Sequence, residues 1–314
     1  MRRAGPLDLP VKVEQALIVA DDHPVHLTHL PKPMFPDGTR KRDLLDFAHD
    51  TAPFLLPHLR DRPYTMKRYP DGITGQYFFQ KNAGPWAPAW LRTVEFGGVN
   101  YILCNDAATL LYVVNAGCID HNIWMSRAAS PEEPDFVLLD LDPGPETPFA
   151  RVVRVAQQLR RLLEEFEISA FLKTSGATGL HIWIPIAPGH SFQQTQQFAA
   201  LLLRMAAART PELVTEIWSV AGRPPGRVYL DFRQNAHGKT IPPPYSPRAR
   251  PGAPVSCPLQ WSELRASLDP ARFTMAAVRR RLDHYGDLFA GALPGRPHDS
   301  LQTMLRRMQA RRAG

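Results

Sequence analysis

The chain has 314 residues, 44% of them hydrophobic, and it carries a net charge of +7 with an isoelectric point near 9.5. This length supports one large core or two smaller ones, which excludes a disordered chain. No apolar stretch reaches the length of a membrane span, and Cys104, Cys118 and Cys257 are too widely separated for a zinc motif or a disulfide framework. Composition therefore predicts a soluble, cytoplasmic globular protein with a polyanionic partner and no membrane association.

Short strands and two helices are expected in the first third of the chain. In chain order these are a helix over 41–49, strands over 64–69 and 77–80, a hairpin of 93–96 with 99–103, and a helix over 107–116. The hairpin prediction depends on Gly97-Gly98, because two residues between alternating runs are a favoured connection.

The middle of the chain predicts a sheet with helices on one of its faces. Its expected elements are a strand ending at Asp140, an amphipathic helix over 152–166, strands over 170–174 and 180–186, a second amphipathic helix around 198–205, and a strand around Asp231. This order is typical of an α+β fold. A proline-rich loop over 242–258 and a basic helix over 301–312 should follow.

Two aspartates end the apolar segment 136–142. Residues two apart in a strand point to the same side, so Asp140 and Asp142 present carboxylates ~7 Å apart, where a divalent cation would offset their repulsion. Asp231, in a second short strand, is the candidate third ligand of a two-metal site that holds Mg²⁺ or Mn²⁺. The alternative is that the first two acids only begin the turn at Pro143-Gly144, and that an arginine holds Asp231.

A glycine-rich turn joins the two central strands. Ser175-Gly176-Ala177-Thr178-Gly179 combines hydroxyl donors with glycines that let backbone N–H groups approach an anion, so a phosphate could bind there. His181 shares the polar face of the returning strand with Trp183 and could donate to a triphosphate. The alternative is a plain hairpin in which His181 is a surface residue.

A basic segment follows Asp231. Its arginines and Lys239 supply donors for phosphate oxygens, and Gln234 or Asn235 could hydrogen-bond a sugar or a base edge. The alternative is a solvated basic loop.

These motifs together resemble the polymerase domain of bacterial DNA ligase D, a member of the archaeo-eukaryotic primase superfamily that acts in non-homologous end joining. The resemblance runs in order from about Leu30 to Trp261. It rests on Asp140-Leu141-Asp142-Pro143-Gly144, Thr174-Ser175-Gly176 to Gly179-Leu180-His181, Asp231 with Gln234-Asn235, Lys239-Thr240, and Tyr245-Ser246-Pro247-Arg248-Ala249-Arg250.

The resemblance implies a site for a nucleoside triphosphate and two divalent metal ions, manganese preferred or magnesium. The metal ligands would be Asp140, Asp142 and Asp231, and the triphosphate would contact Ser175, His181, Arg248 and Arg250. Thr178 stands where some relatives have lysine, so that triphosphate contact is either missing or supplied by Lys173 or Lys239. His121 matches a family histidine near the incoming sugar, and His121 or Asn235 is the predicted contact for a ribose 2′-hydroxyl.

The resemblance also implies a site for broken DNA in the first third of the chain. Lys32, Lys41 and Lys67 match lysines that bind the 5′-phosphate of a break or gap, and Phe78 and Phe79 match an aromatic pair that stacks on template bases. The alternative for the phenylalanines is that one of them is a core residue.

The implied fold is a primase-like α+β catalytic core of mixed and antiparallel sheets flanked by helices, with its active site in a cleft between two lobes. We expect a single catalytic domain over 12–292, with lobes over about 12–130 and 134–265, and a basic tail over 293–314. The chain would be a stand-alone polymerase or part of a longer protein.

The predicted function is template-dependent addition of nucleotides, preferentially ribonucleotides, to 3′ ends at DNA breaks or gaps. The implied partners are DNA with 5′-phosphorylated breaks, gaps or overhangs, nucleoside triphosphates, and a separate DNA ligase and Ku-type end-binding protein. Two alternatives from other classes are a non-catalytic DNA-end bridging protein and a metal-dependent nuclease.

Overall fold

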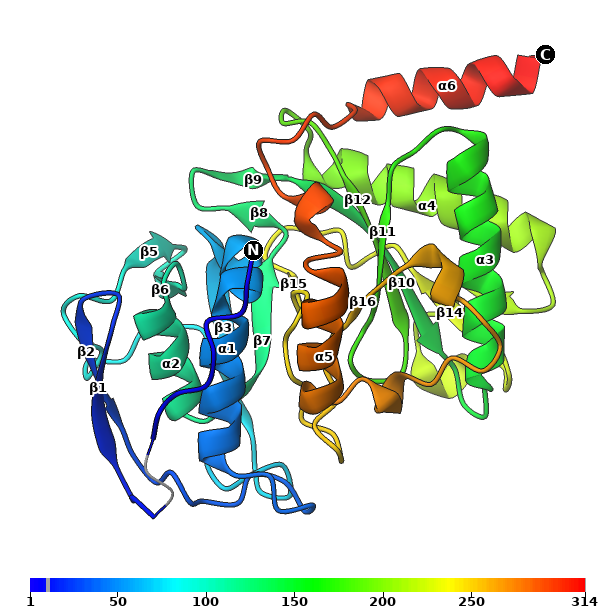
Figure 1. Cartoon of the computed structure of the whole chain (residues 1–314). Helices are drawn as coiled ribbons and strands as arrows, with labels where there is room; N and C mark the ends of the chain where they lie inside the picture. Colours follow the sequence, from blue (N-terminus) through cyan, green and yellow to red (C-terminus); the bar gives the residue numbers. More distant parts are fainter. Residues whose placement is uncertain (10–11, 314) are drawn as a thin grey trace. The chain divides into compact units, whose positions relative to one another are not determined.

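A computed structural model describes residues 1–9 and 12–313 (Figure 1). The chain divides into two compact units, each built from separate segments. Unit 1 contains residues 1–129, 240–257 and 271–287, and unit 2 contains residues 130–239, 258–270 and 288–314. Each unit therefore has its own sheet and its own covering helices, and each is described by itself.

Unit 1 is organised around an antiparallel sheet with the strand order β15-β7-β3-β6-β5 and with β4 paired to β3. Its strands are β3 (Pro63–Arg68), β4 (Phe78–Gln80), β5 (Thr93–Phe96), β6 (Val99–Leu103), β7 (Cys118–Trp124) and β15 (Thr240–Ile241). A separate hairpin of β1 (Ala16–Ala20) and β2 (His23–Leu27) packs against α2 (Ala107–Asn115), and a two-residue strand, β8, covers Ser126–Arg127.

The hairpin prediction is confirmed by β5 and β6. Gly97 and Gly98 have φ angles of +58° and +77°. Residues with a side chain rarely adopt such positive angles, and the two-residue turn requires them. The second predicted helix is also confirmed, as α2, whose N-cap residue Asp106 accepts a hydrogen bond from the backbone of Thr109 at 2.7 Å.

The first helix, α1 (Lys41–Leu59), is longer than the predicted 41–49. It continues through Pro53 and Pro57, each of which removes one backbone donor. The burial of Phe47, Phe54 and Leu55 outweighs these losses. The helix α5 (Met275–Tyr285) completes unit 1 and was not predicted.

Unit 2 contains a six-stranded sheet with the order β13-β14-β10-β12-β11-β16. All neighbouring pairs are antiparallel except β13 with β14. The strands are β10 (Phe136–Pro143), β11 (Phe171–Thr174), β12 (Leu180–Pro185), β13 (Val214–Thr215), β14 (Val228–Asp231) and β16 (Pro258–Leu259), and the outlying β9 covers Ser130–Pro134.

Two helices of unit 2, α3 (Phe149–Glu165) and α4 (Phe192–Arg209), pack against β10 (Figure 1). Alternation along β10 divides its residues between the two faces of the sheet. Val137, Leu139 and Leu141 form the fully buried apolar set, whereas Asp140 and Asp142 lie on the opposite face. The predicted α+β class is therefore confirmed, and helices cover the apolar face of the acid-bearing strand.

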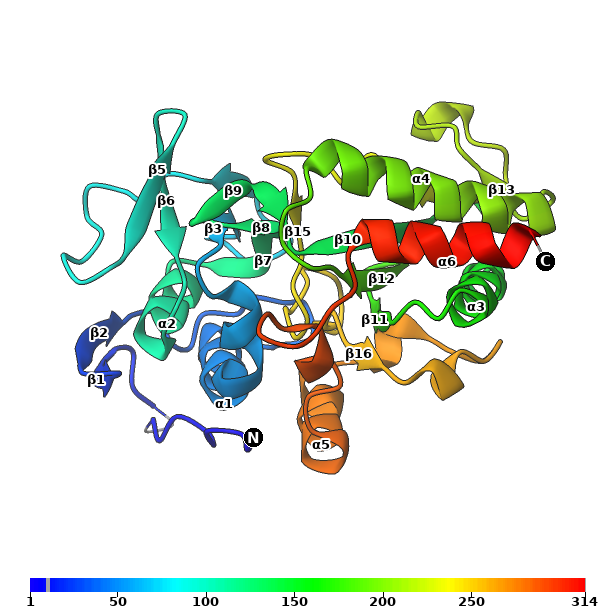
Figure 2. The ribbon, with the colours of Figure 1, turned by 90° about the horizontal axis from the view of Figure 1, so that it is seen from above.

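The predicted basic helix near the end of the chain is α6 (Leu301–Ala313), which runs beside α4 (Figure 2). Leu301, Met304 and Met308 are the buried residues on one side of this helix.

Four short 3-10 helices cover Val220–Gly222, Trp261–Glu263, Pro270–Arg272 and Ala290–Ala292. The predicted lobes and the cleft between them stay predictions. Over the described ranges, none of the helices has the length and apolar character needed to cross a membrane.

Candidate active site

The three predicted metal ligands lie on one face of the unit 2 sheet. Asp140 on β10 stands directly opposite Asp231 on β14, and Asp142 lies two residues further along the same face of β10. Both β10 acids lie within the strand, so the alternative that they only begin the turn at Pro143 is wrong. The Oδ1 atom of Asp231 accepts a hydrogen bond from the backbone N–H of Arg233 at 2.9 Å.

The row of acids continues onto the neighbouring strands as a histidine and a lysine. His181 on β12 is the register partner of Asp140, and its Nε2 lies 3.3 Å from Asp140 Oδ1. Lys173 on β11 is the partner of His181, and its Nζ lies 2.9 Å from His181 Nδ1. His181 is 3% exposed, so the alternative of a surface histidine is wrong.

Lys173 is fully buried, which sequence reasoning did not predict. A lysine ammonium has only donors, so its contact with His181 Nδ1 makes that nitrogen the acceptor and leaves the ring hydrogen on Nε2. The Nε2–H then faces the carboxylate of Asp140. Lys173 therefore fixes the orientation and the tautomer of the His181 ring, and the ring directs its Nε2 atom toward Asp140.

The glycine-rich turn lies beside the acid-bearing strand. A Cβ atom added to Gly179 would stand 2.4 Å from the carbonyl oxygen of Leu141 and 3.2 Å from Asp142 Oδ1, so only glycine allows this approach. The Ser175 hydroxyl accepts hydrogen bonds from the backbone of Ala177 at 3.1 Å and of Gly179 at 3.0 Å. Ser175 thus shapes the turn, and its contact with a triphosphate stays a prediction.

Asn235 joins the two acid-bearing strands. Its side chain is fully buried, with Oδ1 accepting from Leu138 N–H at 2.8 Å and Nδ2 donating to Leu138 O at 2.8 Å and to Phe232 O at 3.0 Å. The amide thereby extends the pairing of β10 with β14 beyond the last paired residues, Asp140 and Asp231. This structural task was not predicted, and the predicted sugar contact of Asn235 stays a prediction.

The donor set of this row fits a hard divalent cation, because carboxylate oxygens are the ligands that Mg²⁺ and Mn²⁺ prefer. The strand register brings the three aspartates to adjacent positions. Within residues 1–9 and 12–313, no group of three or more His, Cys, Asp or Glu side chains is already closed around one point. The backbone register places the three acids side by side, and their role as metal ligands stays a prediction.

Unit 1 has a charged cluster centred on Asp120, a residue that sequence reasoning missed. Asp120 is buried and accepts hydrogen bonds from the backbone of Ala249 at 2.7 Å and from the hydroxyl of Tyr69 at 3.3 Å. Its carboxylate also lies 3.4 Å from Arg248 Nε and 3.7 Å from Lys67 Nζ. Burial, and then the charge of Asp120, raise the pKa of Tyr69. Asp120 therefore pairs with Arg248, which the resemblance assigned to the triphosphate, and with Lys67, which it assigned to the 5′-phosphate of the DNA.

A second group of cations surrounds Lys41. Its side chain is 6% exposed and has no carboxylate partner among the described residues. Burial, followed by the positive charges of Lys32 and Arg68, lowers the pKa of Lys41 from 10.5 to about 8. The backbone N–H of Lys41 donates to Lys32 O at 2.9 Å, and Arg68 is fixed by a 2.8 Å hydrogen bond to Gln80. Such a group is suited to a phosphate, which would offset the repulsion.

The two predicted stacking residues are both at the surface of β4. Phe78 is 46% exposed and Phe79 is 57% exposed, so the alternative that one of them is a core residue is wrong. The guanidinium of Arg68 lies 5.2 Å from the ring centre of Phe78. Lys67 Nζ lies 4.0 Å from the ring centre of Tyr77 and 5.6 Å from that of Phe79. Each exposed ring therefore has a cation beside it.

A model of the LigD primase-polymerase domain family matches residues 40–289, which include the acid row, the Asp120 cluster, Lys41 and Arg68. The chain belongs to this family. The match confirms the resemblance stated from the sequence motifs, and it includes the strands that carry Asp140, His181 and Asp231.

Curated relatives in the LigD family agree with this assignment. The bifunctional non-homologous end joining protein LigD of Bacillus subtilis is 34% identical over 277 residues, which are 86% of this chain and 45% of that protein. The multifunctional non-homologous end joining protein LigD of Mycolicibacterium smegmatis is 30% identical over 273 residues, which are 85% of this chain and 36% of that protein. The chain thus spans less than half the length of these relatives.

A solved LigD structure has the same fold. The polymerase domain from Mycobacterium tuberculosis Ligase D, determined in complex with DNA, superposes with a TM-score of 0.80 and 30% identity. The match covers 86% of this chain and 98% of that chain. The primase-like fold predicted from the resemblance is therefore confirmed.

Three further residues predicted to bind the nucleotide, His121, Lys239 and Arg250, do not belong to the acid row or to the two cation groups. His121 is buried, its Nδ1 contacts the hydroxyl of Tyr64, and burial lowers its pKa to about 4, so the ring is neutral at physiological pH. Lys239 and Arg250 are exposed. The roles of all three stay predictions.

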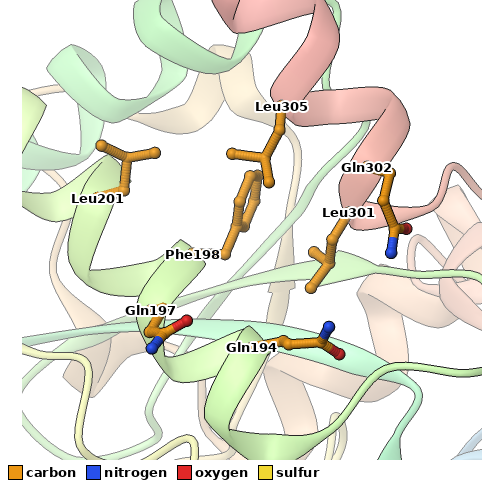
Figure 3. Close-up of a pocket in the computed structure, with 7 residues that line it drawn as sticks. All are labelled: Gln194, Gln197, Phe198, Leu201, Leu301, Gln302 and Leu305. Atoms are coloured by element: carbon orange, nitrogen blue, oxygen red, sulfur yellow. The ribbon is translucent and has the colours of Figure 1, made fainter.

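One apolar pocket of unit 2 is not part of this site. It has a volume of about 380 Å³ and lies between α4 and α6 of unit 2 (Figure 3). Phe198 and Leu201 face Leu301 and Leu305 across it, with glutamines at its edge. A lining without cations or carboxylates suits neither a metal ion nor a triphosphate.

Proposed function

We propose that the chain is a template-dependent nucleotidyltransferase that adds nucleotides, ribonucleotides preferentially, to 3′ ends at DNA breaks or gaps during non-homologous end joining. The observation that carries the proposal is the pairing of Asp140 with Asp231, with Asp142 on the same face, in a member of the LigD primase-polymerase family. A protein that only bridges DNA ends would not need three carboxylates beside a polyanion.

The three aspartates would hold two divalent ions, with Mn²⁺ preferred over Mg²⁺. When bound, such ions lower the pKa of a primer 3′-hydroxyl and neutralise the charge of the β- and γ-phosphates. The β10–β14 register fixes the separation of Asp140 and Asp231, and the Asn235 amide keeps the two strands paired beyond them.

His181 and Lys173 would orient the reacting groups. The buried ammonium of Lys173 keeps the ring hydrogen of His181 on Nε2, so His181 can donate toward Asp140 or toward a phosphate oxygen of a bound nucleotide. The turn held by Ser175 would lie against the triphosphate, and Arg248, oriented by Asp120, would add a charge-assisted hydrogen bond.

Unit 1 would hold the broken end of the DNA. Lys32 and Lys41, with Arg68 beside them, form a cation group suited to a 5′-phosphate. The exposed rings of Phe78 and Phe79 would stack on template bases. The M. tuberculosis relative was determined in complex with DNA, which supports DNA as the partner. A separate ligase, a Ku-type protein and a cytoplasmic location complete the proposal.

The test is extension of a labelled primer on gapped DNA in the presence of Mn²⁺, with and without nucleoside triphosphates. The proposal predicts extension that requires nucleotide, follows the template base, and is faster when the downstream end carries a 5′-phosphate. Primer shortening without added nucleotide would favour the nuclease, because two-metal sites also catalyse hydrolysis. Tight DNA binding with neither extension nor shortening would favour the end-bridging protein.

A further inference from the structure

The apolar pocket between α4 and α6 of unit 2 has no part in the proposed reaction. Four large side chains line it, with Phe198 and Leu201 on α4 and Leu301 and Leu305 on α6 (Figure 3). Phe198 and Leu301 are buried, whereas Leu201 and Leu305 are only half-buried. An open apolar pocket of about 380 Å³ is large enough to take a bulky side chain of another molecule.

The two helices that border the pocket are basic. They contain no aspartate, glutamate or lysine, and their charged residues are Arg204 and Arg209 in α4, and Arg306, Arg307, Arg311 and Arg312 in α6. Arg306 is exposed and has no carboxylate partner among residues 1–9 and 12–313. Arg204 pairs with Glu216 and Arg311 with Glu167, but all four side chains are exposed, so these pairs contribute little. The border of the pocket therefore attracts carboxylates.

The combination of an apolar pocket with arginines favours a protein as the partner. Arginine is enriched and lysine is depleted at protein interfaces. A single-stranded nucleic acid would need exposed rings for its bases, and Phe198 is only 3% exposed. A membrane would need a free apolar side of α6, and Leu301, Met304 and Met308 are already buried. A second copy would bring arginines opposite arginines, which is unfavourable.

We propose that the pocket between α4 and α6 binds an acidic amphipathic helix of a partner protein. An apolar side chain of that helix would enter the pocket, and its carboxylates would pair with the arginines around it. Gln197 and Gln302, exposed on opposite helices at the pocket edge, can each donate to a carboxylate. Asp140 and Asp142 lie on the sheet face that α4 does not cover, so a partner docked here leaves the acid row free. The inference goes beyond the proposed function and does not depend on it.

The test is fluorescence anisotropy with the full chain and a labelled peptide of about 15 residues that forms an amphipathic helix, with leucine and phenylalanine on one side and glutamate on the other. Leu305→Glu places a charge in the pocket. The double variant Gln197→Glu with Gln302→Glu keeps the side-chain size and adds charge at the edge. Gln193→Glu, exposed on α4 outside the pocket, is the matched control. Thermal unfolding checks that each variant is folded, and the double variant decides if Leu305→Glu is not.

We expect Leu305→Glu to weaken peptide binding about tenfold or more, and the double variant roughly three- to tenfold, because each opposes the charge or the apolar contact of the peptide. Gln193→Glu should change the affinity less than about twofold, since salt screens a charge outside the pocket. Peptides with lysine in place of glutamate, or with alanine in place of leucine and phenylalanine, should bind about tenfold more weakly to the unmodified chain.

Peptide binding that neither pocket variant weakens would place the peptide elsewhere on this basic chain and overturn the inference. The absence of saturable binding up to about 1 mM peptide would overturn it as well. Single-stranded DNA is the competitor that distinguishes the other class of polyanion. If such DNA displaces the peptide and Leu305→Glu weakens both ligands equally, the surface binds nucleic acid and the inference is wrong.

Discussion

The side-chain amide of Asn235 pairs with the backbone of Leu138 as a neighbouring strand would. Oδ1 accepts from Leu138 N–H and Nδ2 donates to Leu138 O, each at 2.8 Å. Leu138 lies two residues before Asp140, and Asn235 lies four residues after Asp231. The amide therefore ties together the two strands that carry the opposed acids.

Asn235→Ala should lower the free energy of unfolding by about 1–3 kcal/mol, because it leaves the buried N–H and C=O of Leu138 without partners. Denaturant titration measures this change. Gln196→Ala is the matched control, since within the described residues its side chain donates one long hydrogen bond, to Asn235 O at 3.5 Å, and its loss should be nearly neutral. If Asn235→Ala kept full stability and lost only nucleotide affinity, the strand-joining role would be wrong.

Lys173→Met should slow nucleotide incorporation by on the order of tenfold or more, as is typical when a residue behind a metal-site ligand is removed. Methionine fills a similar volume but no longer donates to His181 Nδ1, so the orientation of the ring toward Asp140 is lost. Single-turnover extension measures the rate, and thermal unfolding checks that the variant is folded. An unchanged rate in a folded variant would show that the lysine has no part in orienting His181.

The preference for 5′-phosphorylated DNA should weaken as the pH rises through about 8. Burial, and then Lys32 and Arg68, lower the pKa of Lys41 to about 8, so its ammonium is present below that pH and is lost above it. Lys41→Arg should remove this pH dependence, because arginine stays charged. Fluorescence anisotropy with 5′-phosphate and 5′-hydroxyl DNA at pH 7 and pH 9 measures the preference.

The lowered pKa of Lys41 has the opposite effect on folding stability. In the unfolded chain the Lys41 side chain has its ordinary pKa of 10.5, so between about pH 8 and that value the unfolded state binds more protons. The contribution of Lys41 to folding stability therefore rises with pH over this range while its contribution to phosphate binding falls. A phosphate preference that was constant from pH 7 to pH 9 would contradict the account.

Phe78→Ala and Phe79→Ala should each weaken DNA binding by about 1–3 kcal/mol, the usual value of one ring stacked on a base. Both rings are exposed in unit 1, so neither change should lower the melting temperature appreciably. Anisotropy titration with templated and blunt DNA measures the loss, and Val19→Ala, at another exposed apolar residue of unit 1, is the control. Unfolding of either phenylalanine variant would instead indicate a packing role.

Local pattern was enough to predict the sheet that carries the acids. Alternation and helical spacing predicted β10, α3, β11, β12 and α4, because each of these elements buries one regular apolar face. The strand β7 was missed, because its buried sequence places the polar residues Asp120, His121 and Asn122 consecutively, which breaks the alternation of apolar and polar positions. Tertiary burial, which a single sequence does not display, overrides alternation there.

The positions of the three aspartates could be predicted from residue type and motif, but their partners could not. The contacts of His181 with Lys173 and of Asn235 with Leu138 depend on strand register, which is set by the whole sheet. Asp120 was missed for the same reason, since the groups it binds come from β3 and from the loop around Arg248.

The most direct measurement of the central claim is templated primer extension on 5′-phosphorylated gapped DNA with Mn²⁺, comparing the unmodified chain with Asp140→Asn, Asp142→Asn and Asp231→Asn. Glu164→Gln, an exposed acid on α3 of the same unit, is the matched control. The account predicts that each aspartate variant folds and binds DNA but extends no primer, while Glu164→Gln extends at the rate of the unmodified chain. Extension by Asp140→Asn or Asp231→Asn at that same rate would contradict it.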